Sequence, residues 1–446
     1  MSNASASADE TISVTLSAKK ASAQQSVIHA VKGMNDLLPD DAGLWETFED
    51  TVREVFRQYG YRLMRAPIVE PTALFVRGIG DATDIVEKEM YSFIDSMNGD
   101  PLTLRPEATA GIVRAAIEHN LLYNGPQRVW TVGPMFRHER PQKGRYRQFH
   151  QFDAEALGYE GPDVDAEQIA MLVRLWKKIG LDNVELQINS IGDAEERREH
   201  REKLIAHFEA NSSSLDGDAN RRLYSNPLRI LDSKNPAMQP IIESAPQLLD
   251  LLGDASLAHF NGLRALLDDA GIRYSINPRL VRGMDYYNRT VYEFVTPIGD
   301  TPLTITGGGR YDGLFEQLGG KPAPAIGFGM GIERVILALQ ERKTAFAVPV
   351  PDAYVIHAGT GASRIAWQAA EMLREDGRRV VVHAGGGSFK SQMKKADASG
   401  ARHALIVGVD EAAAGEVSLK PLREASEQQR ISLSRLREHF AAIVQP

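Results

Sequence analysis

The stretch from Phe136 to Gln151 holds more basic chemistry than any other part of the chain. An apolar run, Val129–Val132, precedes it, and a polar–apolar alternation from Arg147 to Phe152 ends it, with a turn-forming stretch, Pro141–Gly144, between them. This order predicts a β-hairpin with a cationic mouth. Guanidinium groups bind phosphate oxygens through two parallel hydrogen bonds, so the hairpin suits a polyanion such as a triphosphate. The cations are Arg137, Arg140, Lys143, Arg145 and Arg147.

A basic hairpin can also be an exposed sheet edge that positive charge protects from unwanted strand pairing. Glu139 and Phe149 interrupt the basic run at strand positions. A purely protective edge has no need of either residue. The interruption therefore favours a binding site over a solvated edge.

A second cationic feature follows a glycine-spaced strand. Gly327, Gly329 and Gly331 leave room for a ligand or a neighbouring strand to approach the backbone. Arg334 comes three residues later, in the first turn of a predicted helix Ile332–Leu339, where the helix dipole disfavours a cation. A bound phosphate would remove that penalty. The alternative is tight strand–helix packing with the Arg334 side chain reaching solvent.

The usual nucleotide motifs are missing from the chain. No G-x-x-x-x-G-K-[ST] is present, and no glycine cluster fits G-x-G-x-x-G in a strand–turn–helix context. If the chain handles ATP, it does so with arginines on an antiparallel sheet. The run Leu280–Tyr287, with Arg282 between apolar residues and a pair of tyrosines, indicates a binding wall, although such a pair can also be one core and one surface residue.

Size and composition set the outer limits. A chain of 446 residues indicates two or three domains, and an apolar fraction of 43% is enough for a large core. The net charge of −8 excludes a protein that coats nucleic acid over its whole surface, so a nucleic-acid partner must meet local basic patches. Cysteine is absent, which excludes disulfides and thiolate metal sites and fits a reducing compartment. No apolar run approaches the roughly 18 residues needed to span a bilayer.

The pattern divides the chain into four parts. Residues 1–27, rich in Ser and Ala without an apolar core segment, are predicted to be a disordered tail and not a signal or transit peptide. Residues 28–345 mix helices and strands, with a charged helical insertion at about 193–265. A proline-containing linker is expected at 346–352. In residues 353–446, three apolar runs alternate with helical stretches, which predicts an α/β domain with a buried parallel sheet.

Several of these motifs together resemble a known family. Arg137 in the hairpin, Arg334 after the glycine strand and the segment around Pro67 are similar to the three motifs of class II aminoacyl-tRNA synthetases. Leu104–Thr109, Val281–Asn288 and Gly307–Leu314 (GGGRYDGL) are similar to segments peculiar to histidyl-tRNA synthetases. The resemblance extends from Val31 to about Glu411.

The resemblance implies an α+β catalytic domain on an antiparallel sheet, a helical insertion and a C-terminal α/β anticodon-binding domain, in a cytoplasmic homodimer. The implied reaction has two steps. The carboxylate of L-histidine attacks the α-phosphate of ATP, which binds with Mg²⁺, and the histidyl group then passes to the end of the histidine tRNA. The products include AMP and pyrophosphate. No metal held by the protein alone and no membrane partner are implied.

The resemblance also implies roles for particular residues. Arg282 and Arg137 are the expected catalytic residues. Histidine binding is expected at Glu107, Ala108, Thr109, Arg137, Gln151, Glu155, Arg282, Tyr286 and Tyr287. ATP binding is expected at Arg137, Glu139, Phe149 and Arg334, and tRNA contacts are expected at Arg140, Gln142, Lys390 and Lys394.

Some alternatives stay open at this point. Strand alternation puts Asp153 and Glu155 on one face, so either carboxylate can read the imidazole. Glu107 can instead cap the helix that follows it, and the lysines can be the wet face of a helix. Three rival functions remain: a histidine-sensing regulatory subunit related to these enzymes, a simple nucleotide- or RNA-binding module, and a class II enzyme for another amino acid, which would leave the run Arg282–Tyr287 unexplained. The rival subunit would be expected to lack the C-terminal domain and some phosphate-binding arginines, which this chain has.

Overall fold

The computed structural model describes residues 27–81, 83–231, 233, 235–299, 301–342, 350–424 and 427–443. The predicted disordered tail, 1–27, lies outside the described residues except for its last residue. The predicted linker, 346–352, lies outside them except for residues 350–352.

An eight-stranded sheet forms the centre of the larger part of the chain, with the strand order β1-β5-β6-β11-β10-β9-β7-β8. All neighbouring pairs from β5 to β7 in this order are antiparallel, while β1 and β8 pair in parallel at the two edges. The antiparallel sheet predicted from the sequence is therefore confirmed. The strands are β1 (Arg62–Leu63), β5 (Gln127–Phe136), β6 (Gln148–Leu157), β7 (Glu185–Ser190), β8 (Ser275–Ile276), β9 (Asn288–Ile298), β10 (Thr301–Arg310) and β11 (Ala325–Gly331).

The predicted basic hairpin is the pair β5 and β6. Its strands register from Gln127 opposite Leu157 to Phe136 opposite Gln148. Alternate residues of β6 face opposite sides of the sheet. Phe152 and Ala154 belong to the main apolar core, so Gln151, Asp153 and Glu155 point to the other side.

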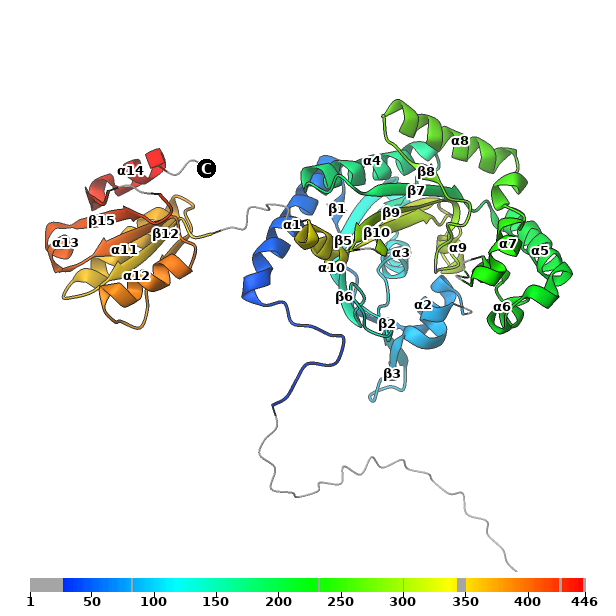
Figure 1. Cartoon of the computed structure of the whole chain (residues 1–446), viewed down its shortest axis with the longest axis horizontal. Helices are drawn as coiled ribbons and strands as arrows, with labels where there is room; N and C mark the ends of the chain where they lie inside the picture. The colour runs from blue at the N-terminus through cyan, green and yellow to red at the C-terminus, as the bar shows by residue number, and fades with distance from the viewer. Residues whose placement is uncertain are drawn as a thin grey trace, which may run out of the picture.

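Four helices cover one face of the sheet: α1 (Pro39–Gln58), α4 (Pro162–Lys178), α8 (Asp254–Asp269) and α10 (Ile332–Glu341). Figure 1 shows α1 and α4 along the outside of the strands. Their apolar stripes meet the strands in one core, in which Phe56 of α1 makes edge contacts with Trp130, Phe152 and Phe328. Burial of this face holds the central strands rigid.

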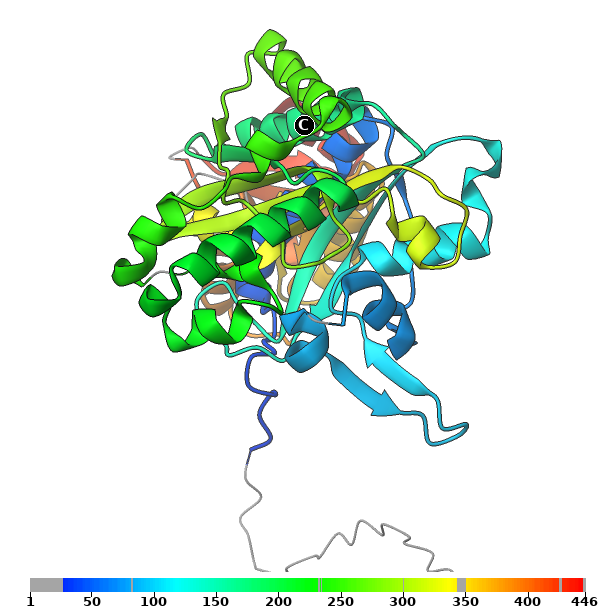
Figure 2. The same ribbon diagram turned by 90° about the vertical axis from the view of Figure 1, so that its right-hand side faces the viewer.

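The other face is covered only in part, by α2 (Thr72–Ile79), α3 (Thr109–Glu118) and α9 (Leu314–Gln317). A small antiparallel sheet of β2 (Val69–Pro71), β4 (Pro101–Leu104) and β3 (Tyr91–Ile94) adjoins α2, and a π-helical turn spans Ile85–Glu89. The hairpin of β3 and β4 projects from the body in Figure 2. The incomplete cover leaves one side of the central strands open to a cavity.

Between β7 and β9 the chain is mainly helical. Helices α5 (Ala194–Ala210), α6 (Gly217–Arg222) and α7 (Gln239–Glu243), with 3-10 turns between them, share a small core around Phe208 and Met238. Figure 1 shows these helices, in green, grouped beside the sheet. Glu196 joins the two ends of this region, because its carboxylate accepts hydrogen bonds from the backbone of Asp193 and Gly253 at 2.6 Å.

The C-terminal residues form a separate five-stranded sheet, with the order β13-β12-β14-β15-β16. The first three strands in this order are parallel, which confirms the predicted α/β fold. The two antiparallel strands, β15 and β16, were not predicted. The elements are β12 (Ala353–His357), α11 (Ala362–Glu375), β13 (Val380–Val382), α12 (Phe389–Ala398), β14 (His403–Val407), α13 (Val409–Ala414), β15 (Glu416–Pro421), β16 (Gln429–Ser432) and α14 (Leu436–Ile443).

Across the described ranges, no helix combines the length and the apolar character that crossing a membrane requires.

A buried charged cluster fastens the helical layer to the end of β10. The guanidinium of Arg310 is fully buried, and its Nε donates to Asp165 Oδ2 of α4 at 3.2 Å. His259 of α8 shares that oxygen through a 2.8 Å hydrogen bond from its Nε2. Backbone carbonyls of Tyr159 and Gly161 accept from the rest of the guanidinium. Because each of the three guanidinium nitrogens has a hydrogen-bond acceptor, the buried charge is tolerated.

We expect Asp165→Asn to destabilise the protein by about 3–5 kcal/mol, since it leaves the Arg310 cation buried without its main countercharge. The loss should appear as a lower urea midpoint for unfolding of the part that contains the eight-stranded sheet, at unchanged slope. Asp182→Asn is the control, because Asp182 is 83% exposed and its pair with Arg342 lies at the surface. Equal midpoints for the two variants would contradict the assignment of Asp165.

Candidate functional site

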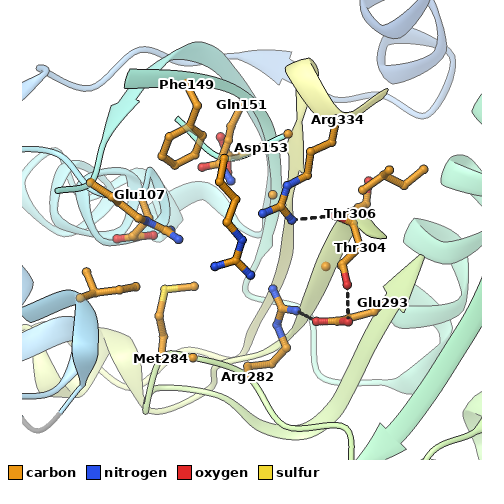
Figure 3. Close-up of a pocket in the computed structure, with 18 of the residues that line it drawn as sticks. Glu107, Phe149, Gln151, Asp153, Arg282, Met284, Glu293, Thr304, Thr306 and Arg334 are labelled. Atoms are coloured by element: carbon orange, nitrogen blue, oxygen red, sulfur yellow. Dashed lines mark hydrogen bonds and ion pairs between the residues drawn. The ribbon is translucent and has the colours of Figure 1, made fainter. Parts of the chain in front are cut away.

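A cavity of about 370 Å³ opens on the uncovered face of the sheet. Its walls come from β6, β10, β11, the beginnings of α3 and α10, and the irregular segment that follows Leu280 (Figure 3). The predicted site residues that it collects are Glu107, Thr109, Arg137, Glu139, Phe149, Gln151, Arg282, Tyr286, Tyr287 and Arg334.

Other predicted residues lie elsewhere. Ala108 and Glu155 are buried but do not line the cavity. Arg140 and Gln142 are exposed at the mouth of the hairpin, where Gln142 forms an isolated bridge with Arg145. Lys390 and Lys394 are exposed on α12 of the C-terminal domain and border a shallow depression with Lys420.

Five arginines line the cavity, and the three predicted from the sequence come from three different segments. Arg137 comes from the end of the hairpin, donates from Nε to the carbonyl of Pro106 at 2.9 Å and lies over the ring of Phe149. Arg334 donates from Nε to the carbonyl of Gly144 at 3.0 Å. Arg282 forms an ion pair with Glu293. Each guanidinium is thus held by a fixed partner while part of it stays available to a ligand.

The electrostatics of Arg334 indicate a site built for an anion. Burial, together with the neighbouring cations Arg145 and Arg137 and against the opposing effect of Glu139, lowers the pKa of Arg334 to about 10. A cation is therefore kept where both desolvation and like charge oppose it. A bound phosphate would relieve both effects.

The opposite wall of the cavity is acidic. Glu107 accepts hydrogen bonds from the backbone N–H of Thr109 at 2.7 Å and of Ala110 at 2.9 Å, so it does cap α3 as the alternative interpretation proposed. It also lines the cavity, so capping and ligand binding are compatible. Burial raises the pKa of the Glu107 and Asp153 carboxyls. Within the described part of the chain, Asp153 Oδ2 and Gln151 Oε1 are buried without a hydrogen-bond partner, which marks two acceptors available to a donor ligand.

Glu155 lies behind this wall. Its carboxylate accepts a 2.7 Å hydrogen bond from the Thr109 hydroxyl and another from the Tyr311 hydroxyl. Burial raises its pKa well above the usual range of a glutamate. Asp153, in contrast, faces the cavity.

Glycines on β11 make room for these carboxylates. Gly327 pairs with Glu155 and Gly329 with Asp153 across the two strands. A Cβ on Gly327 would overlap with the Glu155 carboxylate, and a Cβ on Gly329 would lie 2.8 Å from Asp153 Oδ1. The alternate glycines of β11 therefore leave the space that the side chains of Glu155 and Asp153 occupy.

Aromatic rings close the inner end of the cavity. The rings of Tyr286 and Tyr287 lie 4.6 Å apart between centroids, and Tyr311 meets Tyr286 edge-on at 5.6 Å. All three side chains are buried. A small planar ring would be enclosed by them on several sides.

Sequence reasoning missed several lining or supporting residues. Glu293 and Thr304 connect Arg282 with Arg334, and the Tyr311 hydroxyl donates a hydrogen bond to Glu155. Glu293 carried one usable signal, since it is a lone charge in the apolar strand Val291–Val295. Thr304 carried none, because its role depends on the pairing of β9 with β10.

In the described residues, no group of three or more His, Cys, Asp or Glu side chains is arranged to hold a metal ion.

Two family models match the chain. One describes histidyl-tRNA synthetase and matches residues 33–335, and the other describes an anticodon binding domain and matches residues 352–443. Among curated proteins, the histidine–tRNA ligase of Methylobacillus flagellatus is 62% identical over 406 residues, 91% of this chain and 97% of that protein. The histidine–tRNA ligase of Aromatoleum aromaticum is 61% identical over 410 residues, 92% of this chain and 93% of that protein.

Solved structures agree. The apo histidyl-tRNA synthetase of S. aureus is 35% identical with a TM-score of 0.77, covering 93% of this chain and all of that one. A Bacillus halodurans protein described as an ATP phosphoribosyltransferase regulatory subunit/histidyl-tRNA synthetase shares the fold at 22% identity and a TM-score of 0.60. At that identity the likeness concerns the fold alone.

An antiparallel sheet with an arginine-lined cavity, followed by an α/β domain of the anticodon-binding type, defines a class II aminoacyl-tRNA synthetase. The matched family model and the relatives at about 60% identity then decide the amino acid. This chain belongs to the histidyl-tRNA synthetase family.

Proposed function

We infer that the chain joins histidine to its tRNA, and we propose that the cavity described above carries out the first step, the formation of histidyl-adenylate from histidine and ATP. The histidine carboxylate attacks the α-phosphate, and pyrophosphate leaves. The tRNA then takes the histidyl group, and AMP is released. Neither step needs a covalent bond to the enzyme, so the chain must supply positioning and charge stabilisation.

One observation carries this proposal: arginines, among them Arg137, Arg282 and Arg334, and the carboxylates Glu107 and Asp153 line a single cavity. The reaction needs cations for the triphosphate and for the amino acid carboxylate, and it needs acceptors for the ammonium group. The two ends of the cavity meet these opposite demands. A module that binds only nucleotides would not need carboxylates in the same cavity, because carboxylates repel phosphate groups.

The cationic end takes ATP. Arg137 bridges the α-phosphate and the histidine carboxylate, and Arg334 holds the γ-phosphate. Phe149 stacks on adenine, which requires a small shift of Arg137, since its guanidinium lies 5.3 Å from that ring centroid. ATP binds with Mg²⁺, an ion that prefers oxygen ligands, and the carboxylate of Glu139 on the cavity wall fits that preference beside the triphosphate oxygens.

The acidic end takes the amino acid. Glu107, Thr109 and Gln151 receive its ammonium group, with the buried Ala108 fixing the backbone between the first two. Tyr286 lines the ring pocket. Tyr287 and Glu155 hydrogen-bond the imidazole, which offers one donor and one acceptor nitrogen. The burial of Glu155 behind Thr109 means that it must exchange its hydroxyl partners for the ring, whereas Asp153 already faces the cavity.

The remaining parts of the proposal concern tRNA and assembly. Arg140 and Gln142, exposed beside the ATP end, contact the acceptor end of the tRNA, while Lys390 and Lys394 contact the anticodon stem-loop. The protein acts as a homodimer in the cytoplasm. Exposed apolar side chains on the small sheet, Val69, Phe93 and Ile94, would gain from being covered by a second copy.

The first test uses histidine-dependent exchange between ATP and pyrophosphate, which reports adenylate formation without tRNA. Arg282→Ala should lower the exchange rate on the order of 10²–10³-fold, because a fixed cation meets negative charge that grows during the attack. The histidine dependence should change far less. Arg279→Ala, an exposed arginine of the same segment, is the matched control and should exchange normally. A near-normal rate for Arg282→Ala would remove this residue from the mechanism.

The second test separates the two candidate carboxylates. Glu155→Gln should raise the KM for histidine strongly and leave ATP binding almost unchanged, because a pocket whose buried polar groups lose a partner discriminates by about 10⁴-fold or more. Asp153→Asn is the paired variant, measured in the same exchange assay. If only Asp153→Asn raises the KM for histidine, Asp153 and not Glu155 is the carboxylate that hydrogen-bonds the imidazole.

The third test concerns tRNA. Lys390→Ala combined with Lys394→Ala should weaken tRNA binding and lower the slope of log affinity against log salt by about 1 per lysine. Pyrophosphate exchange should be unaffected, since α12 contributes nothing to the cavity. Arg364→Ala combined with Arg435→Ala, two exposed cations of the same domain, is the control for net charge. An equal change in the salt slope for both pairs would contradict a specific contact at α12.

A further inference from the structure

The two arginines Arg282 and Arg334 are joined by one hydrogen-bonded chain. Arg334 Nη1 donates to the backbone carbonyl of Thr304 at 2.7 Å, and the Thr304 hydroxyl donates to Glu293 Oε2 at 2.8 Å. The other oxygen of Glu293 pairs with Arg282 Nη1. Figure 3 shows these contacts as dashed lines between Arg334, Thr304, Glu293 and Arg282. Thr304 links Arg334 to Glu293, because its carbonyl accepts from the arginine and its hydroxyl donates to the carboxylate.

An irregularity in the sheet puts Thr304 in this position. Thr304 pairs with Val295 and Thr306 with Phe294, so the register of β10 against β9 shifts at Ile305. A bulge of this kind re-aims side chains that regular alternation would place elsewhere. Thr304, Ile305 and Thr306 all line the cavity as a result.

Arg282 needs such a support more than the other arginines do. It belongs to the irregular segment between β8 and β9, whereas Arg334 lies on α10. Its side chain is only 16% exposed, and Gly307 makes room for it, because a Cβ there would overlap the guanidinium. Glu293 comes from the middle of the rigid strand β9 and therefore fixes a side chain that its own backbone holds loosely.

We propose that Glu293 and Thr304 are positioning residues that set the place and orientation of Arg282 relative to Arg334 before ATP binds. Glu293 balances the charge of Arg282 in a cavity already crowded with cations, and Thr304 holds Glu293 in the orientation that does so. When the triphosphate binds, the Arg282 guanidinium is already in the conformation that contacts the α-phosphate. The inference rests on the assignment of Arg282 and Arg334 to phosphates under the proposed function.

Thr304 provides the cleanest test, because Thr304→Val keeps the shape and the backbone carbonyl and removes only the hydroxyl. Thr304→Val should lower the maximal rate of pyrophosphate exchange roughly 10-fold, since a modest misplacement of a catalytic group has a large effect on rate. The KM for histidine should stay the same. Thr304→Ser, which restores the hydroxyl, should recover the rate. Thr296→Val is the control: Thr296 lies on β9 outside the cavity, where its hydroxyl donates to Asn183.

A double-mutant cycle then shows whether Thr304 acts through Arg282. In an Arg282→Ala background, Thr304→Val should have no further effect on the exchange rate. Fully additive effects would overturn the proposal, as would a silent Thr304→Val combined with an impaired Arg282→Ala. If Arg282→Ala itself exchanges normally, the phosphate assignment fails instead, so the two failures are distinct.

Glu293→Gln adds a second, independent measurement. The proposal predicts a reduced maximal rate at an unchanged Mg²⁺ requirement. A raised Mg²⁺ requirement without coupling between Thr304 and Arg282 would mean that Glu293 serves the metal ion, and would overturn the positioning role. Because Thr304→Val and Thr304→Ser leave every charge in place, they keep the test valid even if Glu293→Gln fails to fold.

Discussion

The structure depends on holding like charges close together in one partly buried cavity. Arg137, Arg282 and Arg334 repel one another, and the acidic wall of Glu107 and Asp153 carries its own repulsion and desolvation. Side chains on mobile loops would relax away from such an arrangement. Asp153 lies on β6 of the packed sheet, and the three arginines, on segments beside the sheet, are held by the carbonyls of Pro106 and Gly144 and by Glu293. Packing of the covered face and these contacts together keep the like charges in place.

Space is the second requirement, and missing side chains supply it. Gly327 leaves the volume that the Glu155 carboxylate occupies, and Gly307 does the same for the Arg282 guanidinium. These glycines lie on neighbouring strands, in ordinary extended conformations. These glycines therefore allow the Glu155 carboxylate and the Arg282 guanidinium to approach the backbone where a Cβ would otherwise lie. The sheet forms a polar pocket at these positions while its strands stay paired.

The sequence predicts those parts of the fold that local pattern controls. Alternation from Arg147 to Phe152 was enough to find β6 and the face on which Gln151 and Asp153 lie, and continuous apolar runs were enough to find the parallel strands β12 and β14. The sequence did not predict contacts between segments that are far apart along the chain. Glu155 meets Tyr311 and Glu293 meets Thr304 only because of strand pairing, and the bulge at Ile305 has no signature in composition. The short strands β15 and β16 lack an apolar run and were missed for the same local reason.

The end of β10 shows how the packed rear face and the site act on each other. Arg310 points into the buried cluster with Asp165, while the next residue, Tyr311, donates to Glu155 on the acidic wall. Asp312 then accepts from the side-chain amide of Asn288, the residue that follows Tyr287 of the ring pocket. Three consecutive residues thus divide their side chains between the core, the acidic wall and the aromatic wall. A disturbance of the buried cluster has a short covalent path to Glu155 and Tyr287, which links the stability of the helical layer to the geometry of the acidic and aromatic walls of the cavity.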